Sequence, residues 1–394
     1  MIDSPIDSRV TDGVPIEYVS DDARLAALCE IWMLEPAIAL DTEFERTNTF
    51  YARIGLIQIG DGKACYLIDP HTIEDWSAFK RLLTTASCTV VMHSCSEDLN
   101  LLQTYLGTLP ASLFDTQLAA AFLGIGFSIS YQGLVAEMLG VEVAKDETRS
   151  DWIRRPLSEE QIYYAATDVR YLLQVYESLK QQLIERGMSD WFEADCAQQL
   201  ATACLAEDEA QWQTYYAGVS NAWRLDKPGL VALKRLCAWR EQTARRRNKP
   251  RSWIVKDNDL MSLCNAVSAA MMSNNLNEGD IANASNVDRR FLQRNAAEIY
   301  RVLKDPVASA EVDTSLLTRP LNAAMRKKLK LSKQAAQAKA EQLGMAPELL
   351  GRKKYLIDLL RDFGSSGQLR WSGEFAGWRR DLLESDLLSA LNES

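Results

Sequence analysis

The sequence predicts an α/β domain followed by two small all-helical bundles, and three observations lead to this expectation. Short apolar runs alternate with turn residues over the first 70 residues, a pattern typical of strands. From Asp115 onward the apolar residues follow helical spacing, and beyond Trp212 the strand pattern disappears. Strands that lead into helices early, followed by helices alone, favour an α/β domain over roughly residues 1–205 with helical domains behind it.

Five apolar runs in the first half are predicted to form buried strands, at residues 16–20, 37–44, 54–60, 64–69 and 88–93. Helices are expected at about 21–34 and 96–106. Ser158 and Gln161 have the spacing of a capping box, so a further helix should begin there and run to about residue 186.

The second half divides at residues 305–320, whose sequence DPVASAEVDTSLLTRP has the composition of a turn or linker. We therefore expect three domains, at 1–210, 215–305 and 320–392. Each of the last two is long enough for a small helical bundle.

Charge is distributed unevenly along the chain. The net charge is −10, and 47% of the residues are hydrophobic, which excludes a disordered chain. Residues 1–211 hold 34 acidic and 14 basic side chains, whereas residues 212–305 hold 9 and 16, and residues 306–394 hold 11 and 14. An acidic front half joined to a basic back half indicates nucleic acid or an acidic surface as a partner.

Several classes of site and location are disfavoured. The eight cysteines include no CxxC pair, which argues against zinc ribbons and redox motifs and favours buried free thiols. The chain has only two histidines, so any metal site must depend on carboxylates. No secretion signal or membrane-spanning run occurs, and we expect a soluble, cytoplasmic protein.

The strongest local feature is the run AIALDTEF, in which Asp41 and Glu43 interrupt an apolar strand. Side chains two residues apart on a strand share a face, so these carboxylates should project together. Two acids at the end of a buried strand are unfavourable unless a positive charge neutralises them, and Mg²⁺ prefers oxygen ligands of this kind. The alternative is an exposed strand end with two solvated acids.

A second run places acids at the start of a helix. In HSCSED, a strand ends at His93 and a helix carrying Glu97 and Asp98 begins, a position where α/β sheets bind ligands. Either acid could instead interact with the helix dipole, His93 could be a satisfied strand-end residue, and a Cys95–His93 nucleophile is a weaker alternative.

In YYAATD, Tyr164 and Asp168 are one helical turn apart and share a face. Asp168 could act as a further carboxylate ligand and Tyr164 could orient a water molecule. The alternative is an ordinary amphipathic helix with a tyrosine packed inward.

The ordered set DTEF, HSCSED and YxxxD resembles the three exonuclease motifs of the DEDD superfamily in its tyrosine subtype. The longer runs DTEFERTNTFYARIGLIQIG, HSCSEDLNLL and YYAATDVRYL resemble the ribonuclease D family. The run from Leu233 to Asp257 is similar to an HRDC domain, the helical module of ribonuclease D and RecQ helicases, and residues 321–391 would be a divergent second copy. The resemblance implies a ribonuclease H-like exonuclease domain with a mixed sheet flanked by helices, followed by two HRDC-like bundles.

The same resemblance implies the roles of individual residues. Asp41, Glu43, Asp98 and Asp168 would bind two divalent metal ions, Mg²⁺ or Mn²⁺, and Tyr164 would orient the attacking water. Glu97 has no family role, and Asp115 in LFDTQLAA is expected to be a helix N-cap rather than a ligand.

The expected activity is therefore 3′-to-5′ exoribonuclease activity that releases 5′-mononucleotides from RNA, with tRNA precursors carrying 3′ extensions as substrates by family analogy. Alternatives are a DNA 3′-to-5′ exonuclease and a non-catalytic nucleic-acid-binding adaptor. The densest basic run could grip RNA phosphates or could be a solvated helix end; it comprises Arg245, Arg246, Arg247, Lys249 and Arg251.

Overall fold

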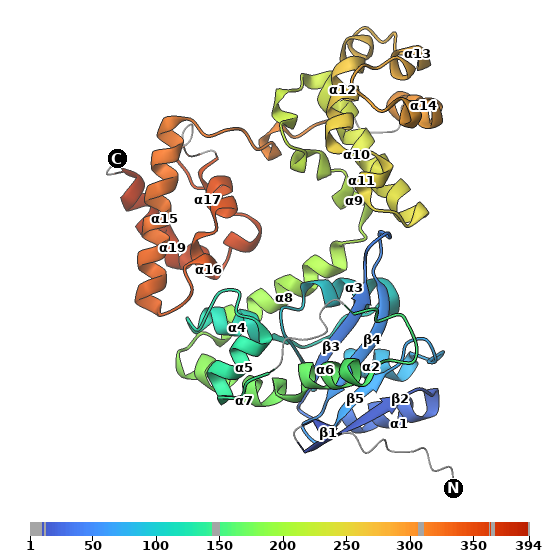
Figure 1. The fold of residues 1–394 in the computed structure, drawn as a ribbon. Helices are drawn as coiled ribbons and strands as arrows, with labels where there is room; N and C mark the ends of the chain where they lie inside the picture. The colour runs from blue at the N-terminus through green and yellow to red at the C-terminus, as the bar shows by residue number, and fades with distance from the viewer. Residues whose placement is uncertain are drawn as a thin grey trace. The chain divides into compact units, whose positions relative to one another are not determined.

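The computed structural model describes residues 10–143, 150–305, 311–361 and 367–392, except residue 12, together with residue 363 (Figure 1). The chain forms two compact units. The first comprises residues 1–45, 53–204 and 321–394, and the second comprises residues 46–52 and 205–320. Each unit is considered separately below.

A seven-stranded mixed sheet is the centre of the first unit. Its spatial order is β1-β2-β5-β4-β3-β6-β7, with β3 antiparallel to β4 and parallel to β6. All five predicted strands are present and the mixed sheet is confirmed. The strands are β1 Val10–Thr11, β2 Val14–Val19, β3 Ala37–Glu45, β4 Arg53–Gly60, β5 Cys65–Ile68, β6 Thr89–Met92 and β7 Leu113–Asp115.

The short strands β1 and β7 were not predicted. The three residues of β7 directly precede a helix, and Asp115 is both the last strand residue and the N-cap of that helix. A run of three residues is too short for an alternating pattern to be recognised, so pairing with β6 is what defines this strand.

Helices cover both faces of the sheet. Helix α6 packs on β3, β4 and β5, and it meets the sheet at Gly60, which is paired with Cys65 of β5. The next residue, Tyr66, therefore faces the other side of the sheet. Its ring contacts Trp32 of α1, with centroids 5.0 Å apart, so α1 lies on the face opposite α6 (Figure 1). The helices of the domain are α1 Asp22–Trp32, α2 Ser77–Leu83, α3 Ser96–Leu106, α4 Thr116–Phe122, α5 Tyr131–Leu139, α6 Glu159–Arg170, α7 Leu172–Glu185 and α8 Ser189–Leu205.

The single helix expected from residue 158 to 186 is two helices. The capping box at its start is present, because Ser158 and Gln161 exchange side-chain and backbone hydrogen bonds. The interruption occurs at Tyr171, whose backbone N–H donates to the hydroxyl of Tyr131 over 3.3 Å, while that hydroxyl donates to the carbonyl of Thr167 over 2.7 Å. A buried tyrosine therefore fixes the end of α6.

The described residues of the second unit are helical apart from loops. Its core surrounds α10 and includes Leu233, Leu236, Leu263 and Ile299. Residues 306–310 of the expected linker lie outside the described residues. The elements are α9 Glu209–Trp212, η1 Tyr215–Gly218, η2 Ala222–Arg224, α10 Lys227–Arg247, α11 Arg251–Ile254, α12 Asp257–Met272, α13 Glu278–Ala282, α14 Arg289–Lys304 and η3 Thr314–Leu316.

The C-terminal helices belong to the first unit. Arg379 forms an ion pair with Asp195 of α8, and Trp378 stacks on Trp191 with ring centroids 5.3 Å apart. None of the helices in the described part of the chain has the length and apolar character needed to cross a membrane. The elements are α15 Ala323–Leu343, α16 Glu348–Gly351, α17 Lys353–Leu360, η4 Gly373–Phe375 and α19 Trp378–Asn392.

Candidate active site

The site begins with the parallel pairing of β3 and β6. Ala39 is paired with Val91, so the carboxyl ends of both strands meet at one edge of the sheet. The apolar run at the start of β3 is buried and anchors the strand, whereas Asp41 and Glu43 are only partly buried. The apolar residues 37–40 therefore anchor the strand, and Asp41 and Glu43 follow directly where this buried run ends.

Helix α6 brings the third acid to the same place. One carboxylate oxygen each of Asp41, Glu43 and Asp168 lies within 4.8 Å of the other two. Gly60 of β4 allows this close packing, because a Cβ atom there would lie 2.7 Å from the carbonyl oxygen of Val169. A glycine next to the helix thus determines how near Asp168 comes to β3.

Burial and mutual repulsion raise the pKa values of this cluster. Burial, then the charges of Asp168 and Asp98, raise the pKa of Glu43 to about 9. Burial raises the pKa of Asp168 to about 7, opposed by a hydrogen bond from Tyr164. Burial and the neighbouring acids also hold the pKa of Asp41 well above its ordinary value.

The fourth predicted acid is set apart from this group. Asp98 lies in the first turn of α3, which runs over the residues predicted for it, and its carboxylate accepts a hydrogen bond from the hydroxyl of Thr42 on β3. Burial raises its pKa to about 6, and the Thr42 bond opposes the rise. Asp98 is thus tied to the same strand as Asp41 and Glu43 but is not one of the three clustered carboxylates.

Tyr164 lies one turn before Asp168 on α6, as the spacing predicted. Its hydroxyl is hydrogen-bonded to Asp168, and its ring packs against Trp152 with centroids 6.0 Å apart. Burial, followed by the charges of Asp168, Glu43 and Asp41, raises the pKa of the phenol above its ordinary value. The phenol is therefore protonated at neutral pH and acts as a hydrogen-bond donor.

The residues at the β6–α3 corner have structural partners. The His93 ring lies 2.9 Å from the hydroxyl of Thr116 and 3.1 Å from the carbonyl of Ile129, and burial lowers its pKa. Burial raises the pKa of Cys95, which is hydrogen-bonded to Asp115, so a Cys95–His93 nucleophile is not supported. Asp115 caps α4, as expected.

Gln58 was missed by the sequence analysis. It lies directly opposite Asp41 in the β3–β4 register, is fully buried, and has no hydrogen-bond partner for either end of its amide among the residues that the structure describes. A single polar residue inside the apolar run IGLIQIG is a signal that could have identified it.

Of the predicted phosphate-binding residues, Arg245 is not free. Its side chain is 8% exposed, is paired with Glu207 and Glu241, and lies over the ring of Trp212. Arg246 and Arg251 have side chains 64% and 46% exposed and are paired with Glu298 and Glu241. Arg247 and Lys249 are exposed. Arg245 is therefore enclosed by side chains of the second unit, and of the five predicted residues it is the one whose side chain is least exposed.

The donor set fits divalent cations. Three clustered carboxylates with raised pKa values repel one another when ionised, and hard oxygen ligands are those that Mg²⁺ and Mn²⁺ prefer. The amide of Gln58, next to Asp41, has no hydrogen-bond partner among the described residues. Buried amides of this kind normally bind a water molecule or a ligand.

Fold and site together define a 3′-to-5′ exonuclease with an appended helical module. A family model for 3′-5′ exonucleases matches residues 16–184, and a model for the HRDC domain matches residues 230–303.

The chain belongs to the ribonuclease D family, and it is a metal-dependent exoribonuclease. It is 39% identical to ribonuclease D of Pseudomonas paraeruginosa, covering 96% of this chain and 98% of the relative, and 34% identical to that of Escherichia coli, with the same coverage. The crystal structure of Escherichia coli RNase D, described as an exoribonuclease involved in structured RNA processing, superposes with a TM-score of 0.77 at 30% identity, covering 96% of this chain and 99% of that one. A protein from Bifidobacterium adolescentis shares the fold, with a TM-score of 0.58 and 19% identity.

Proposed function

We propose that this enzyme removes 5′-mononucleotides from the 3′ end of RNA by hydrolysis at a site with two divalent cations, Mg²⁺ or Mn²⁺. Asp41, Glu43, Asp98 and Asp168 would hold the ions. The observation that carries the proposal is the convergence of three carboxylates from β3 and α6 within 4.8 Å, because such a cluster is unfavourable in its ionised form unless cations neutralise it.

The protein side chains have separate tasks in this mechanism. When bound, two divalent cations supply charge neutralisation at the phosphate and lower the pKa of water. The Tyr164 phenol, protonated at neutral pH, would donate or accept a hydrogen bond that orients the attacking water. Thr42 would keep the Asp98 carboxylate turned toward β3 through its hydroxyl.

RNA would be attracted by the exposed cations at the end of α10 and the start of α11. Arg247 and Lys249 are exposed, and Arg246 and Arg251 keep exposed surface beside their ion pairs with Glu298 and Glu241, whereas Arg245 is internal. Trp253, 60% exposed beside Lys249, could stack on a base. Each phosphate contact should make binding weaker as salt rises.

We infer three functional parts: an exonuclease domain over 1–210, an HRDC domain over 215–305 and a divergent HRDC-like domain over 320–392. The HRDC match at 230–303 supports the second part. Residues Ala323–Leu343 form a long basic helix, which is consistent with a second nucleic-acid-binding module.

The proposed substrate is a tRNA precursor with a 3′ extension. The description of the Escherichia coli relative as acting in structured RNA processing supports a folded RNA. A DNA exonuclease would use the same carboxylates, so matched RNA and DNA strands must be compared, because the 2′-hydroxyl is the group that distinguishes them.

The decisive experiment replaces Asp41 with Asn and follows nucleotide release from a 3′-extended tRNA in the presence of Mg²⁺ or Mn²⁺. Asp41→Asn should abolish release, whereas Glu159→Gln, which removes an exposed acid from the first turn of α6, should leave it intact. Undiminished release by Asp41→Asn would exclude the assignment. Tight tRNA binding by the wild type without any release would instead indicate a non-catalytic adaptor.

A further inference from the structure

The turn that precedes α3 has an unusual backbone. Ser94 has φ of +59°, in the left-handed region that non-glycine residues rarely adopt. The next residue, Cys95, is the N-cap of α3 but makes no capping side-chain hydrogen bond. Because Asp98 lies in the first turn of α3, its position depends on this left-handed turn, which the helix supports through the Ser96 N–H bond to the Ser94 carbonyl but not through a capping side chain.

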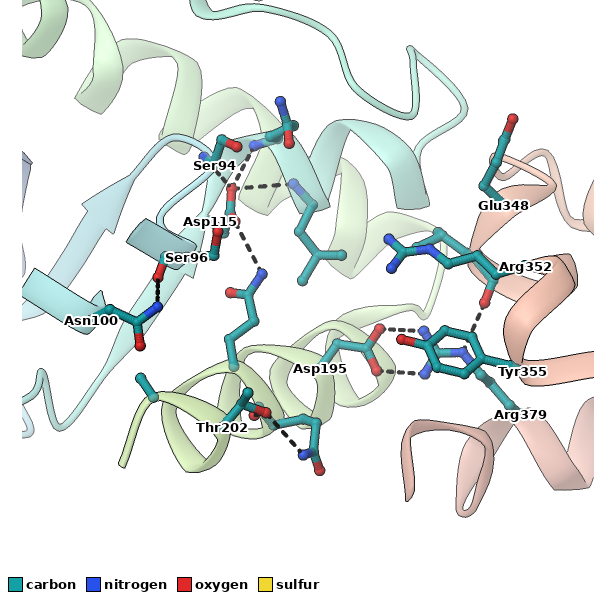
Figure 2. Close-up of a pocket in the computed structure, with 16 residues that line it drawn as sticks. Ser94, Ser96, Asn100, Asp115, Asp195, Thr202, Glu348, Arg352, Tyr355 and Arg379 are labelled. Atoms are coloured by element: carbon teal, nitrogen blue, oxygen red, sulfur yellow. Dashed lines mark hydrogen bonds and ion pairs between the residues drawn. The ribbon is translucent and has the colours of Figure 1, made fainter. Parts of the chain in front are cut away.

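A buried carboxylate from another strand stabilises this turn. Asp115, 3% exposed at the end of β7, accepts a hydrogen bond from the Ser94 backbone N–H over 2.9 Å (Figure 2). The same oxygen, Oδ1, accepts from the N–H groups of Gln117 at 2.9 Å and Leu118 at 3.3 Å, which begin α4. One oxygen atom therefore fixes both the start of α4 and the turn before α3.

The second oxygen of Asp115 is also occupied. Oδ2 accepts from the side-chain amide of Gln199 on α8 over 3.1 Å and from the thiol of Cys95 over 3.5 Å. These contacts hold the carboxylate in one orientation, so the backbone of Ser94 is bound to a rigid group. N-capping of α4 alone would require only the bonds to Gln117 and Leu118.

We propose that Asp115 is a positioning residue for the metal-binding carboxylate Asp98, which it holds in place through the left-handed turn at Ser94. The inference rests on the proposed function, because Asp98 must be a metal ligand for its position to matter. Loss of the Ser94 bond should let the turn relax and displace the first turn of α3. Outer residues that orient metal ligands commonly affect metal affinity or activity by about 10- to 100-fold.

Three variants separate positioning from capping. Asp115→Ser keeps an N-cap for α4 but is too short to reach Ser94 at the same time. Asp115→Asn keeps Oδ1, and therefore every backbone hydrogen bond, while Gln199 can turn its amide to accept from the new NH₂ group. Asp115→Ser combined with Ser94→Gly restores a residue that adopts the left-handed turn without help. Asp21→Ala, which removes the N-cap of α1, is the control for loss of a cap elsewhere.

Mg²⁺ and Mn²⁺ binding by calorimetry and the metal dependence of nucleotide release would be measured for each folded variant. Asp115→Ser should weaken metal binding and lower kcat by about 10- to 100-fold, with KM for RNA nearly unchanged. Asp115→Asn should behave like the wild type, and Ser94→Gly should recover most of the loss in the double variant.

Wild-type metal affinity and kcat in Asp115→Ser would overturn the proposal. A loss in Asp115→Ser that the added Ser94→Gly does not repair would also overturn it, because Asp115 would then serve only as the cap of α4. If Asp115→Ser did not fold, a loss of metal affinity and kcat of about 10-fold or more in Asp115→Asn, which keeps the bond to Ser94, would overturn the proposal. Metal binding is measured without RNA, so the inference can be tested even if the wild type releases no nucleotide and the proposed function fails.

Discussion

Gln58 lies directly across the β3–β4 pair from Asp41, and the two side chains share one face of the sheet. Gly60, two residues further along β4, meets α6 on this face, so Gln58 also points toward the helix that carries Asp168. Both ends of its amide are buried without a hydrogen-bond partner among the described residues. The sheet beneath the candidate active site therefore contains a buried amide. Its burial is unfavourable unless a bound water or a ligand in the site forms hydrogen bonds with it.

Replacing Gln58 with Met tests whether the amide is unpaired in the metal-free protein. The side chains are similar in volume, and removal of an unpaired buried amide should leave the free energy of unfolding unchanged or raise it by about 1 kcal/mol. Denaturant titration in EDTA measures this. A decrease of more than about 1 kcal/mol would mean that Gln58 has a partner in solution, such as a buried water.

Stability without metal, and the stabilisation produced by metal, should both depend on pH. Carboxyl groups with a raised pKa bind more protons in the folded than in the unfolded protein, so the metal-free fold loses stability as pH rises from about 4, the unfolded value, through the folded values. These folded values are about 6 for Asp98, about 7 for Asp168 and about 9 for Glu43. Metal ions compete with these protons, so the rise in Tm produced by Mg²⁺ should be larger at pH 8.5 than at pH 5.5.

Differential scanning fluorimetry in EDTA and in Mg²⁺, across this pH range, checks the expectation. The matched variant is Asp41→Asn combined with Asp168→Asn, which removes two of the three clustered carboxylates. This variant should show a flatter pH dependence in EDTA and little rise in Tm with Mg²⁺. An Mg²⁺-induced rise that is the same at both pH values would contradict the assignment of these acids as ligands.

Gly60→Ala should lower activity by moving α6 away from β3. The added Cβ would lie 2.7 Å from the carbonyl oxygen of Val169, a backbone atom that cannot move without the helix. Because Val169 follows Asp168, the carboxylate of Asp168, a proposed metal ligand, would be displaced, and kcat should fall by about 10-fold or more. The matched control is Gly218→Ala, because a Cβ at Gly218 meets nothing within 4 Å. Gly140→Ala is unsuitable as a control, because its φ of +69° would strain an alanine. Equal activity of the Gly60→Ala and Gly218→Ala variants would show that α6 can shift without loss.

Much of the fold followed from local patterns. The strand 37–44, the helix 96–106 and the capping box at Ser158 are found close to their predicted bounds, because burial and capping act over a few residues. The interruption of the helix at Tyr171 could not be predicted, since it depends on the hydroxyl of Tyr131, 40 residues earlier in the chain.

The same distinction holds for the site. Spacing alone placed Asp41 with Glu43 and Tyr164 with Asp168, as both pairs share one element. The run IGLIQIG marks Gln58 as a lone polar residue, but the position of its amide opposite Asp41 depends on the pairing of two strands. The hydrogen bond from the Ser94 N–H to Asp115 joins a loop to another strand, and no short pattern encodes it. The burial of Arg245 likewise depends on Glu207 and Trp212, which are distant in sequence, so a count of charges could not separate it from its exposed neighbours.

The ion pair between Asp195 of α8 and Arg379 of α19 should contribute far more to stability than an exposed pair of the same domain. Its side chains are only 15% and 8% exposed and form two hydrogen bonds, of 2.7 and 2.5 Å. Asp195→Ala removes the carboxylate partner of the buried Arg379 guanidinium and an acceptor for the indole N–H of Trp378, and should lower the free energy of unfolding by about 3–5 kcal/mol. The control is Glu30→Ala, whose pair with Arg81 has side chains 62% and 58% exposed and should contribute less than about 1 kcal/mol.

Denaturant titration, together with limited proteolysis of the segment from α15 to α19, measures both effects. Asp195→Ala should make this C-terminal segment sensitive to protease under conditions in which the Glu30→Ala variant stays intact. Replacing both partners with apolar residues, Asp195→Leu with Arg379→Met, should recover most of the lost stability, because no charge is then left buried alone. Equal losses in Asp195→Ala and Glu30→Ala would mean that the packing of Trp378 on Trp191, rather than the ion pair, holds the C-terminal helices to α8.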